Sequence, residues 1–343
     1  MSPIHTLCDF FARSGAQTRF YTLGRRVVAC PEATLAAFEA GDQPWPLPWL
    51  GRAQLACVFR LGDAEDPLIW FLSLPLDEQG LLDPAPRDAF LQRLLETLGR
   101  SANRLQGDDE RRIDNLMQDN PLAFTPDITQ RAMLHARASA DLGRPASEHF
   151  ELVEDYLLAA AAEPEQWPAL GLQGLADFSI RHDHAQAGRL AARLHALPVD
   201  VLRPLCHCLE HVEPSADLLQ ALIARGEAAA HEGDIETFSA CVRSVGQGAT
   251  DLVGPWYDAL LADSAACGAD LLAAIAARGW THLEHAQRLP LFLDALARHS
   301  PGGFTSVVRD LALLPRLRLP LLMYLRQASP QSPVGRCLQP LTH

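Results

Sequence analysis

The side chains best suited to hold a metal ion stand together in the segment CHCLEH, residues 206–211. On a helix, His207 and His211 would share one face because they lie four positions apart, and Cys208 would stand beside them. Imidazole and thiolate are ligands that zinc prefers. No second pair of ligands at a matching distance completes the set. We therefore expect no bound metal, with Cys206 and Cys208 as packing residues and both histidines near the surface.

A second group of residues could hydrolyse phosphate esters. All-helical metal-dependent phosphohydrolases of the HD type use a separate His, an adjacent His-Asp pair and a later Asp, and His149, His182, Asp183 and Asp217 resemble that order. The polar residues around the His-Asp pair are more typical of a turn between helices, where Asp commonly caps the next helix. Phosphohydrolysis is therefore an alternative and not the preferred function.

The absence of lysine excludes several enzyme classes. All 29 basic residues are Arg, so the chain cannot be a Walker-type nucleotidase, a pyridoxal-phosphate enzyme, a class I aldolase or a protein kinase. Codon bias in a GC-rich genome and selection against lysine both remain open as causes. No G-x-S-x-G motif is present either. We predict a protein that is not an enzyme and needs no cofactor.

A few residues in the first hundred could contact a partner instead. The proline-rich segment PWPLPW favours an extended backbone that could present two indoles to an aromatic-lined groove. The preferred interpretation is that both indoles pack back over the small sheet. A pair of arginines could meet an acidic patch, although a solvated pair is the commoner arrangement. A pair of carboxylates follows a predicted strand, where it more often forms a solvated turn. The candidates are Arg25, Arg26, Trp45, Trp49, Asp77 and Glu78.

The net charge limits the classes of partner that the chain is expected to bind. A formal charge of −13 argues against non-specific binding to nucleic acid. One segment differs, because no acidic residue follows Asp310 while four arginines do. That segment could lie on an anionic membrane surface, but a helix that caps the end of the fold is preferred. The basic residues are Arg316, Arg318, Arg326 and Arg336.

Hydropathy and cysteine usage indicate a cytoplasmic protein. No apolar stretch approaches the length of a membrane span, and residues 1–15 carry no basic leader followed by an apolar run. The eight cysteines show no framework spacing, which fits a reducing compartment and buried thiols. A membrane location is therefore disfavoured.

The elements that must position these residues fall into two parts. Residues 1–99 predict a helix over 4–14, two strands around Gly24, a helix from Pro31 to Gly41, and two longer strands over 53–61 and 68–74. This pattern favours a small, largely antiparallel sheet with helices packed on one face. Residues 100–110 form the best candidate boundary.

The sequence pattern predicts helices throughout residues 111–328. It predicts a loose tail for residues 329–343. Expected helix starts recur at close to 34 residues, near Pro164, Pro198, Gly233 and Gly268 for first helices and near Asp183, Ser215, Asp251 and His282 for second helices. Such a period is typical of helical hairpins that stack into a solenoid. The fold class is an α+β domain followed by a mainly α helical-repeat domain, an α-solenoid in preference to an irregular bundle.

Two resemblances accompany these patterns. Residues 171–198 resemble a tetratricopeptide unit, with Gly174, Ala176 and Ala187 at small-residue positions. The stretches GRRVV (24–28), PWPLP (44–48) and IWFLSLPLDEQGLL (69–82) resemble an uncharacterised gammaproteobacterial family, a domain of unknown function. That resemblance implies a bacterial cytosolic protein and transfers no catalytic residue.

The preferred function is therefore that of a protein-interaction or adaptor protein. It would present the concave surface of an acidic solenoid to a protein partner, with Arg, His and Trp of the inner helices as anchors. The alternatives are a phosphohydrolase of the HD type and a peripheral membrane adaptor that binds through the basic C-terminal segment.

Overall fold

The computed structural model describes residues 4–60, 66–98, 117, 120–159 and 167–339, which divide between two compact units. The first unit comprises residues 1–130 with 313–315, and the second comprises 131–312 with 316–343. The expected boundary at 100–110 lies outside the described residues, and the first unit continues beyond it to Gln130.

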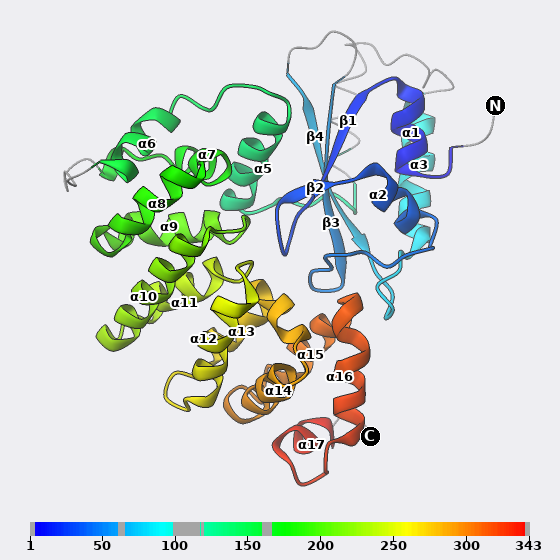
Figure 1. Cartoon of the computed structure of the whole chain (residues 1–343). Helices are drawn as coiled ribbons and strands as arrows, with labels where there is room; N and C mark the ends of the chain where they lie inside the picture. The colour runs from blue at the N-terminus through cyan, green and yellow to red at the C-terminus, as the bar shows by residue number, and fades with distance from the viewer. Residues whose placement is uncertain (1–3, 61–65, 99–116, 118–119, 160–166, 340–343) are drawn as a thin grey trace. The chain divides into compact units, whose positions relative to one another are not determined.

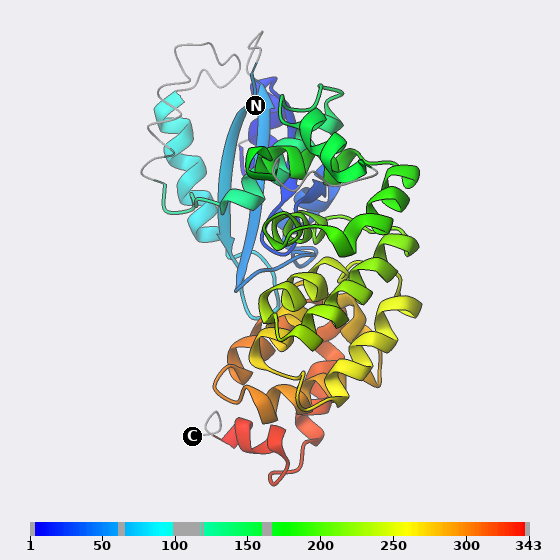
Figure 2. The same ribbon diagram turned by 90° about the vertical axis from the view of Figure 1, so that its left-hand side faces the viewer.

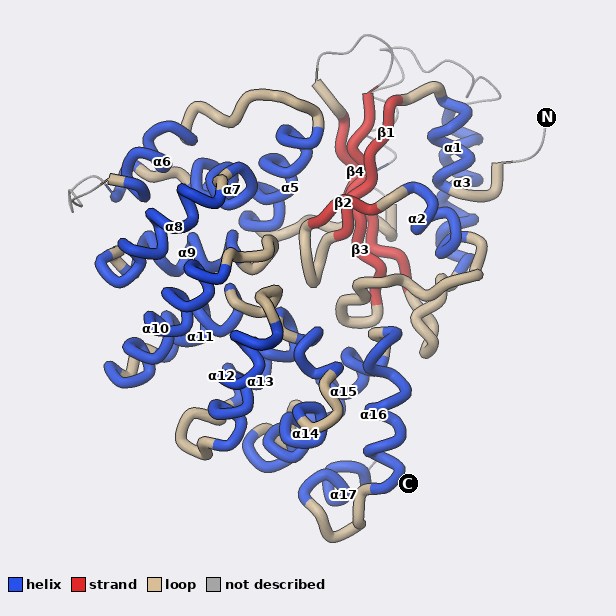
Figure 3. Tube along the Cα trace, viewed as in Figure 1, coloured by secondary structure: helices blue, strands red, loops and turns tan. Residues whose placement is uncertain are grey.

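The first unit is built on a four-stranded antiparallel sheet in the order β2-β1-β3-β4. Helices α1, α2 and α3 lie on one side of this sheet (Figures 1 and 3). The small antiparallel sheet with helices on one face is thus confirmed. The elements are α1 (Leu7–Ser14), β1 (Gln17–Thr22), β2 (Val28–Cys30), α2 (Glu32–Glu39), β3 (Arg52–Arg60), β4 (Leu68–Pro75) and α3 (Pro84–Leu98).

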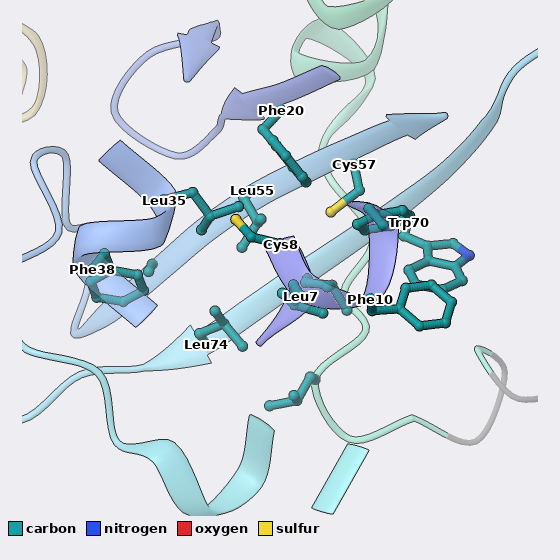
Figure 4. Packing of buried hydrophobic residues seen from close by; sticks show 14 of the residues in the cluster. Leu7, Cys8, Phe10, Phe20, Leu35, Phe38, Leu55, Cys57, Trp70 and Leu74 are labelled. Carbon is teal, nitrogen blue, oxygen red and sulfur yellow. The ribbon is translucent and has the colours of Figure 1, made fainter. Parts of the chain in front are cut away.

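Side-chain alternation along the two long strands builds the core of this unit. Because successive strand residues point to opposite faces, one face of the sheet presents an unbroken apolar surface to the helices. Leu55 pairs with Leu72 and Cys57 with Trp70 across β3 and β4. Figure 4 shows part of this cluster, whose aromatic members pack mainly edge-on or tilted around Trp70. It includes Leu7, Phe10, Phe11, Phe20, Leu35, Phe38, Trp45, Leu55, Phe59, Leu74, Phe90 and Leu94.

A buried carboxylate ties the helices of the first unit together. Glu39, the last residue of α2, accepts hydrogen bonds from the backbone N–H groups of Leu7 at 2.8 Å and Cys8 at 3.1 Å, in the first turn of α1. Arg87 of α3 donates to the Glu39 carbonyl at 2.9 Å. Burial raises the pKa of Glu39, whereas these bonds and the Arg87 charge favour its ionised form. Through its carboxylate and its backbone carbonyl, Glu39 thereby connects α2 to α1 and α3.

Helices follow one another through the rest of the chain, green to red in Figure 2. Their bounds are α5 (Ile128–Asp141), α6 (Phe150–Leu158), α7 (Leu172–Arg181), α8 (His184–Arg193), α9 (Val199–Leu209), α10 (Ala216–Glu232), α11 (Ile235–Ser244), α12 (Thr250–Ala262), α13 (Ala269–Arg278), α14 (Arg288–His299), α15 (Phe304–Ala312), α16 (Pro315–Gln327) and α17 (Pro333–Leu338). Helix α17 lies within the segment expected to be a loose tail, and it packs against α14.

Contacts between these helices alternate along the chain. Among the even-numbered helices, α6 contacts α8, α8 contacts α10, α10 contacts α12, and α12 contacts α14. The odd-numbered helices α7, α9, α11, α13 and α15 contact one another in the same way. Two layers of helices therefore form, each joined by contacts between elements that are one hairpin apart in the sequence.

Capping residues explain where several of these helices begin. Asp183 caps α8 and forms a capping box with Gln186, and the Ser215 hydroxyl accepts from the Leu218 N–H at the start of α10. Helices α9, α11 and α13 start at or within two residues of the expected positions. The expected start near Pro164 lies outside the described residues, and His282 lies in a short 3-10 turn before α14.

We predict that Gly174→Ala lowers the free energy of unfolding of the second unit by about 1–3 kcal/mol. Its Cβ would lie 2.5 Å from the carbonyl oxygen of His149 and 2.7 Å from a methyl of Val153, both on or beside α6. This close approach explains the small residue expected at position 174. Urea unfolding would measure the change.

Gly188→Ala is the matched control, since Gly188 also lies inside a helix but has open space where its Cβ would stand. Alanine there should stabilise by about 0.5–1 kcal/mol through helix propensity. Equal effects of both substitutions would show that the contact between α6 and α7 is looser than described.

Candidate interaction site

Arginine side chains connect several helices of the second unit that stand about one repeat period apart in the sequence. Along the second unit, guanidinium groups bond to backbone carbonyls or carboxylates that lie 30 to 37 positions away in the sequence. That separation matches the period of about 34 expected from the helix starts. The pairs are Arg181 with the carbonyl of Arg144, Arg189 with that of Leu158, Arg193 with that of Tyr156, Arg203 with Asp234, Arg243 with Glu210, and Arg288 with Asp258.

The most buried of these contacts centres on Glu210, directly after α9. Arg243 of α11 donates to both carboxylate oxygens, at 2.7 and 2.9 Å. Arg278 of α13 places its Nε 2.7 Å from Oε1 of the same carboxylate. The Glu210 side chain is 3% exposed and that of Arg278 is 7% exposed. One carboxylate thus joins three consecutive odd-numbered helices.

Two histidines complete this cluster. His207 Nδ1 lies 3.9 Å and His211 Nε2 3.7 Å from the carboxylate oxygens of Glu210. Although burial alone would raise it, the pKa of Glu210 is held well below its usual range, chiefly by Arg278, with further contributions from the His207 hydrogen bond and Arg243. The carboxylate is therefore ionised and saturated with cationic partners.

The structure changes the interpretation of the CHCLEH segment. Cys206 and Cys208 are fully buried packing residues, as expected, but His211 is only 1% exposed and does not lie near the surface. Glu210 stands between the histidines, and two guanidinium groups that occupy its oxygens would repel a metal ion. Among the described residues, no three His, Cys, Asp or Glu side chains form a metal-binding group.

Sequence reasoning missed Glu210, Arg243 and Arg278, although a signal for them exists. Arg181, Arg243 and Arg278 stand in the last turn of α7, α11 and α13, where a cation complements the helix dipole. Glu210 is the residue that caps the C-terminal end of α9, where the arginines at the ends of α11 and α13 reach it. Arginines that recur at helix ends, with an acid directly after α9, are the signal that the sequence offered.

A second buried cluster follows in the next hairpin. Arg288 binds Asp258 through two bonds, at 2.6 and 2.8 Å, and donates to the carbonyl of His282 at 3.0 Å. The His282 ring packs edge-on against Tyr257, with ring centroids 5.2 Å apart. Burial, aided by the nearby Arg288 charge, lowers the pKa of His282 to about 4. His282 is therefore neutral at physiological pH.

Two of the four residues considered for phosphohydrolysis, His182 and Asp183, make local contacts at helix ends. Asp183 caps α8, and Nδ1 of His182 lies 3.0 Å from the carbonyl of Phe178 in its own helix. His149 precedes α6 with its side chain 50% exposed, and Asp217 lies exposed in the first turn of α10. These four side chains do not gather into a metal site in the described structure.

Two of the residues proposed for partner contact are buried in the first unit. Arg25 is 0% exposed, donates from Nε to the Pro48 carbonyl at 2.6 Å, and lies over the Trp49 ring. The expectation of a solvated arginine pair is wrong for Arg25, because a backbone carbonyl and an indole replace water around it. Trp45 is also fully buried and packs on Phe38, as the preferred interpretation expected. Arg26 and Trp49 are partly exposed.

The paired carboxylates and the thiols behave as the commoner interpretation predicted. The Asp77 carboxylate accepts from the N–H groups of Gln79 and Leu81, at 2.7 and 2.9 Å, and so closes a turn after β4. Glu78 is exposed beside it. Seven of the eight cysteines are buried, and burial raises the pKa of Cys30 to about 11. Whether Asp77 and Glu78 meet a partner stays a prediction.

Exposed carboxylates lie along two even-numbered helices that contact each other. Helices α10 and α12 contact each other, and each turns one face to solvent. Between the carboxylates, the exposed positions are mostly small residues, including Ala224, Ala228, Ala259 and Ala262. We call this surface the acidic face, defined by Asp217, Glu227, Glu232, Asp251 and Asp263.

The described helices include none that combines the length and the apolar character needed to cross a bilayer.

We predict that Glu210→Gln destabilises the second unit by about 3–5 kcal/mol, because the buried Arg278 and the partly buried Arg243 would face an uncharged amide. The depressed pKa means that the stabilising contribution is full above pH 4.5 and is lost as the pH falls below it. Urea unfolding at pH 7 and at pH 3.5 would measure both effects.

The matched control is Glu236→Gln. Glu236 also pairs with an arginine of the preceding hairpin, Arg203, but its side chain is 78% exposed. Loss of this ion pair should lower the free energy of unfolding by less than about 1 kcal/mol. If the two variants were equally stable, the buried carboxylate would not organise the repeats.

We predict that His282 makes the second unit sensitive to mild acid. The unfolded chain takes up a proton near pH 6.5 and the folded chain only near pH 4, so stability is full above pH 6.5 and falls as the pH drops toward 4. Between these two pKa values, the free energy of unfolding should change by about 1.4 kcal/mol per pH unit. His282→Gln should remove this slope in urea unfolding, whereas His285→Gln, at an exposed position, should retain it.

Comparison with known proteins identifies a family but no activity. Residues 2–342 match the family model described as a protein of unknown function, DUF3549. No curated protein and no solved structure matches the chain. The resemblance seen in three N-terminal stretches is confirmed and extends over nearly the whole chain, and it indicates no enzyme family. The resemblance of residues 171–198 to a tetratricopeptide unit stays a prediction. The chain belongs to the DUF3549 family.

Proposed function

We propose that this chain is a non-enzymatic protein-interaction protein whose second unit is an α-solenoid that binds a basic protein partner. The observation that carries the proposal is the alternate stacking of helices, joined by arginine contacts across 30 to 37 positions. A stack of this kind buries the apolar faces that single hairpins cannot bury alone. It also creates an extended rigid surface, and helical-repeat proteins commonly bind their partners on such a surface.

The burial of side chains favours the even-numbered helices as the surface that meets the partner. Helices α7, α9, α11 and α13 bury most of their side chains, whereas α8, α10 and α12 alternate buried and exposed positions. The arginines expected as anchors on the inner helices are largely engaged in contacts between hairpins. The proposal therefore moves the partner from the inner helices to the acidic face.

Electrostatics defines the chemistry of this partner. The carboxylates of the acidic face are exposed, and Arg225 lies 3.9 Å from Glu232 at its edge. Exposed charges of one sign attract a surface of the opposite sign and raise the association rate more than the final affinity. A partner with exposed arginine or lysine side chains therefore fits, and its binding should weaken as salt increases.

Neutralising the acidic face tests this function. The full-length protein would capture partners from an extract of native cells, and the affinity of each purified partner would then be measured at low and high salt. The variant Asp217→Asn, Glu227→Gln, Asp251→Asn should bind about tenfold more weakly at low salt and show a smaller dependence on salt. It should remain folded, because all three side chains are exposed.

The matched control removes three exposed carboxylates from the first unit, through Glu32→Gln, Asp42→Asn and Glu96→Gln. This variant has the same net charge as the test variant and should bind as the native chain does. A loss of binding confined to the control would place the interaction on the first unit. Equal binding by all three proteins would refute the acidic face.

A further inference from the structure

Helix α16 carries an apolar stripe on its exposed side. Leu319, Leu322 and Met323 are 66%, 46% and 53% exposed, and their spacing puts them on one face of the helix. Leu317 and Leu321 are 0% exposed and anchor the opposite face. The other large exposed apolar side chains of the described chain are scattered over separate elements. This stripe is thus the place where exposed apolar side chains concentrate.

Arginines flank the stripe at both ends. Arg316 lies one turn before Leu319 and keeps its side chain 82% exposed while it contacts Glu284 at 3.4 Å. Arg326 lies one turn after Leu322 and Met323 and is also exposed. No acidic residue follows Asp310 in the sequence, so this segment supplies no carboxylate of its own, and Glu284, which contacts Arg316, comes from outside it. The exposed side of α16 is therefore apolar in the middle and cationic at the ends.

The charges at the two ends decide between the possible occupants. In a symmetric antiparallel pair of α16 helices from two copies, Arg316 of one would approach Arg326 of the other, and like charges would repel. An anionic bilayer would attract both arginines, but three apolar side chains give a weak anchor and the chain as a whole carries a charge of −13. A protein helix with carboxylates at its ends meets neither objection.

We propose that the exposed side of α16 docks an acidic amphipathic helix of another protein. The partner helix would lay leucine, isoleucine or phenylalanine side chains over Leu319, Leu322 and Met323. Its carboxylates would pair with Arg316 and Arg326, because a planar guanidinium can donate two parallel hydrogen bonds to one carboxylate. Met323 adds an adaptable thioether to the contact. This mode follows the i, i+3, i+4 pattern by which amphipathic helices are recognised.

This surface is independent of the acidic face proposed above. The acidic face selects a basic partner, whereas α16 selects an acidic one, so the two surfaces favour different proteins or opposite regions of one protein. The proposal for either surface can be refuted without affecting the proposal for the other. The test of α16 therefore uses a defined probe and does not depend on the partner of the acidic face.

The test measures binding of a fluorescein-labelled synthetic peptide by anisotropy, with the full-length protein. The peptide would form four helical turns, with leucines along one face and glutamates elsewhere. We expect saturable binding that Leu319→Gln, Leu322→Gln, Met323→Gln weakens at least about tenfold. Arg316→Gln with Arg326→Gln should weaken it and reduce its dependence on salt. A peptide of the same composition in scrambled order should not bind.

A matched control replaces three exposed apolar residues elsewhere, through Leu152→Gln, Ile235→Gln and Leu291→Gln. It should bind the peptide as the native chain does, and circular dichroism would verify that both triple variants are folded. Equal binding by the α16 variant, or by the scrambled peptide, would overturn the proposal. So would vesicles of phosphatidylglycerol that capture the chain through α16 when the peptide does not. Self-association in sedimentation that the α16 variant abolishes would assign the stripe to a second copy.

Discussion

The organisation of the second unit depends on guanidinium groups that reach from one helical hairpin to the next. Arg243 and Arg278 share the Glu210 carboxylate, and the Arg243 fork makes two bonds to it at 2.7 and 2.9 Å. A buried ion cluster of this kind adds little net stability over apolar packing, because both charges lose their hydration. The ion cluster instead disfavours misaligned arrangements, because a hairpin shifted by one helical turn would leave a buried charge without a partner. Apolar packing supplies the free energy and the arginines specify the register.

This use of arginine also determines what the surface looks like. The chain has 29 arginines against 42 carboxylates, and arginines in the second unit are drawn into contacts between hairpins. The carboxylates of α10 and α12 that define the acidic face are exposed. The function proposed for the acidic face therefore relies on carboxylates, whereas the docking proposed for α16 relies on arginine, in the segment where acidic residues end.

Local signals in the sequence predicted the elements well, and long-range contacts account for most of the differences. Asp183 and Ser215 mark helix starts because capping uses bonds within three residues, and Gly24, with φ of 75°, marks the turn between β1 and β2. The burial of Arg25 could not be read in this way, because it depends on the Pro48 carbonyl and the Trp49 ring, 23 and 24 positions away. The exposed stripe on α16 was equally hidden, since the sequence shows an apolar helix but not which neighbours cover it.

The same device recurs in the first unit, which suggests why arginine is suited to both. Arg87 donates to the Glu39 carbonyl and Arg25 to that of Pro48, and each is nearly or fully buried. A guanidinium carries five donors in one plane and is less strongly hydrated than an ammonium group, so it loses less on burial and can serve two acceptors at once. A lysine at Arg278 or Arg25 would bring a compact ammonium that keeps its demand for water. In a chain without lysine, long cationic side chains can enter the interior, and the contacts that hold successive hairpins in register follow from that property.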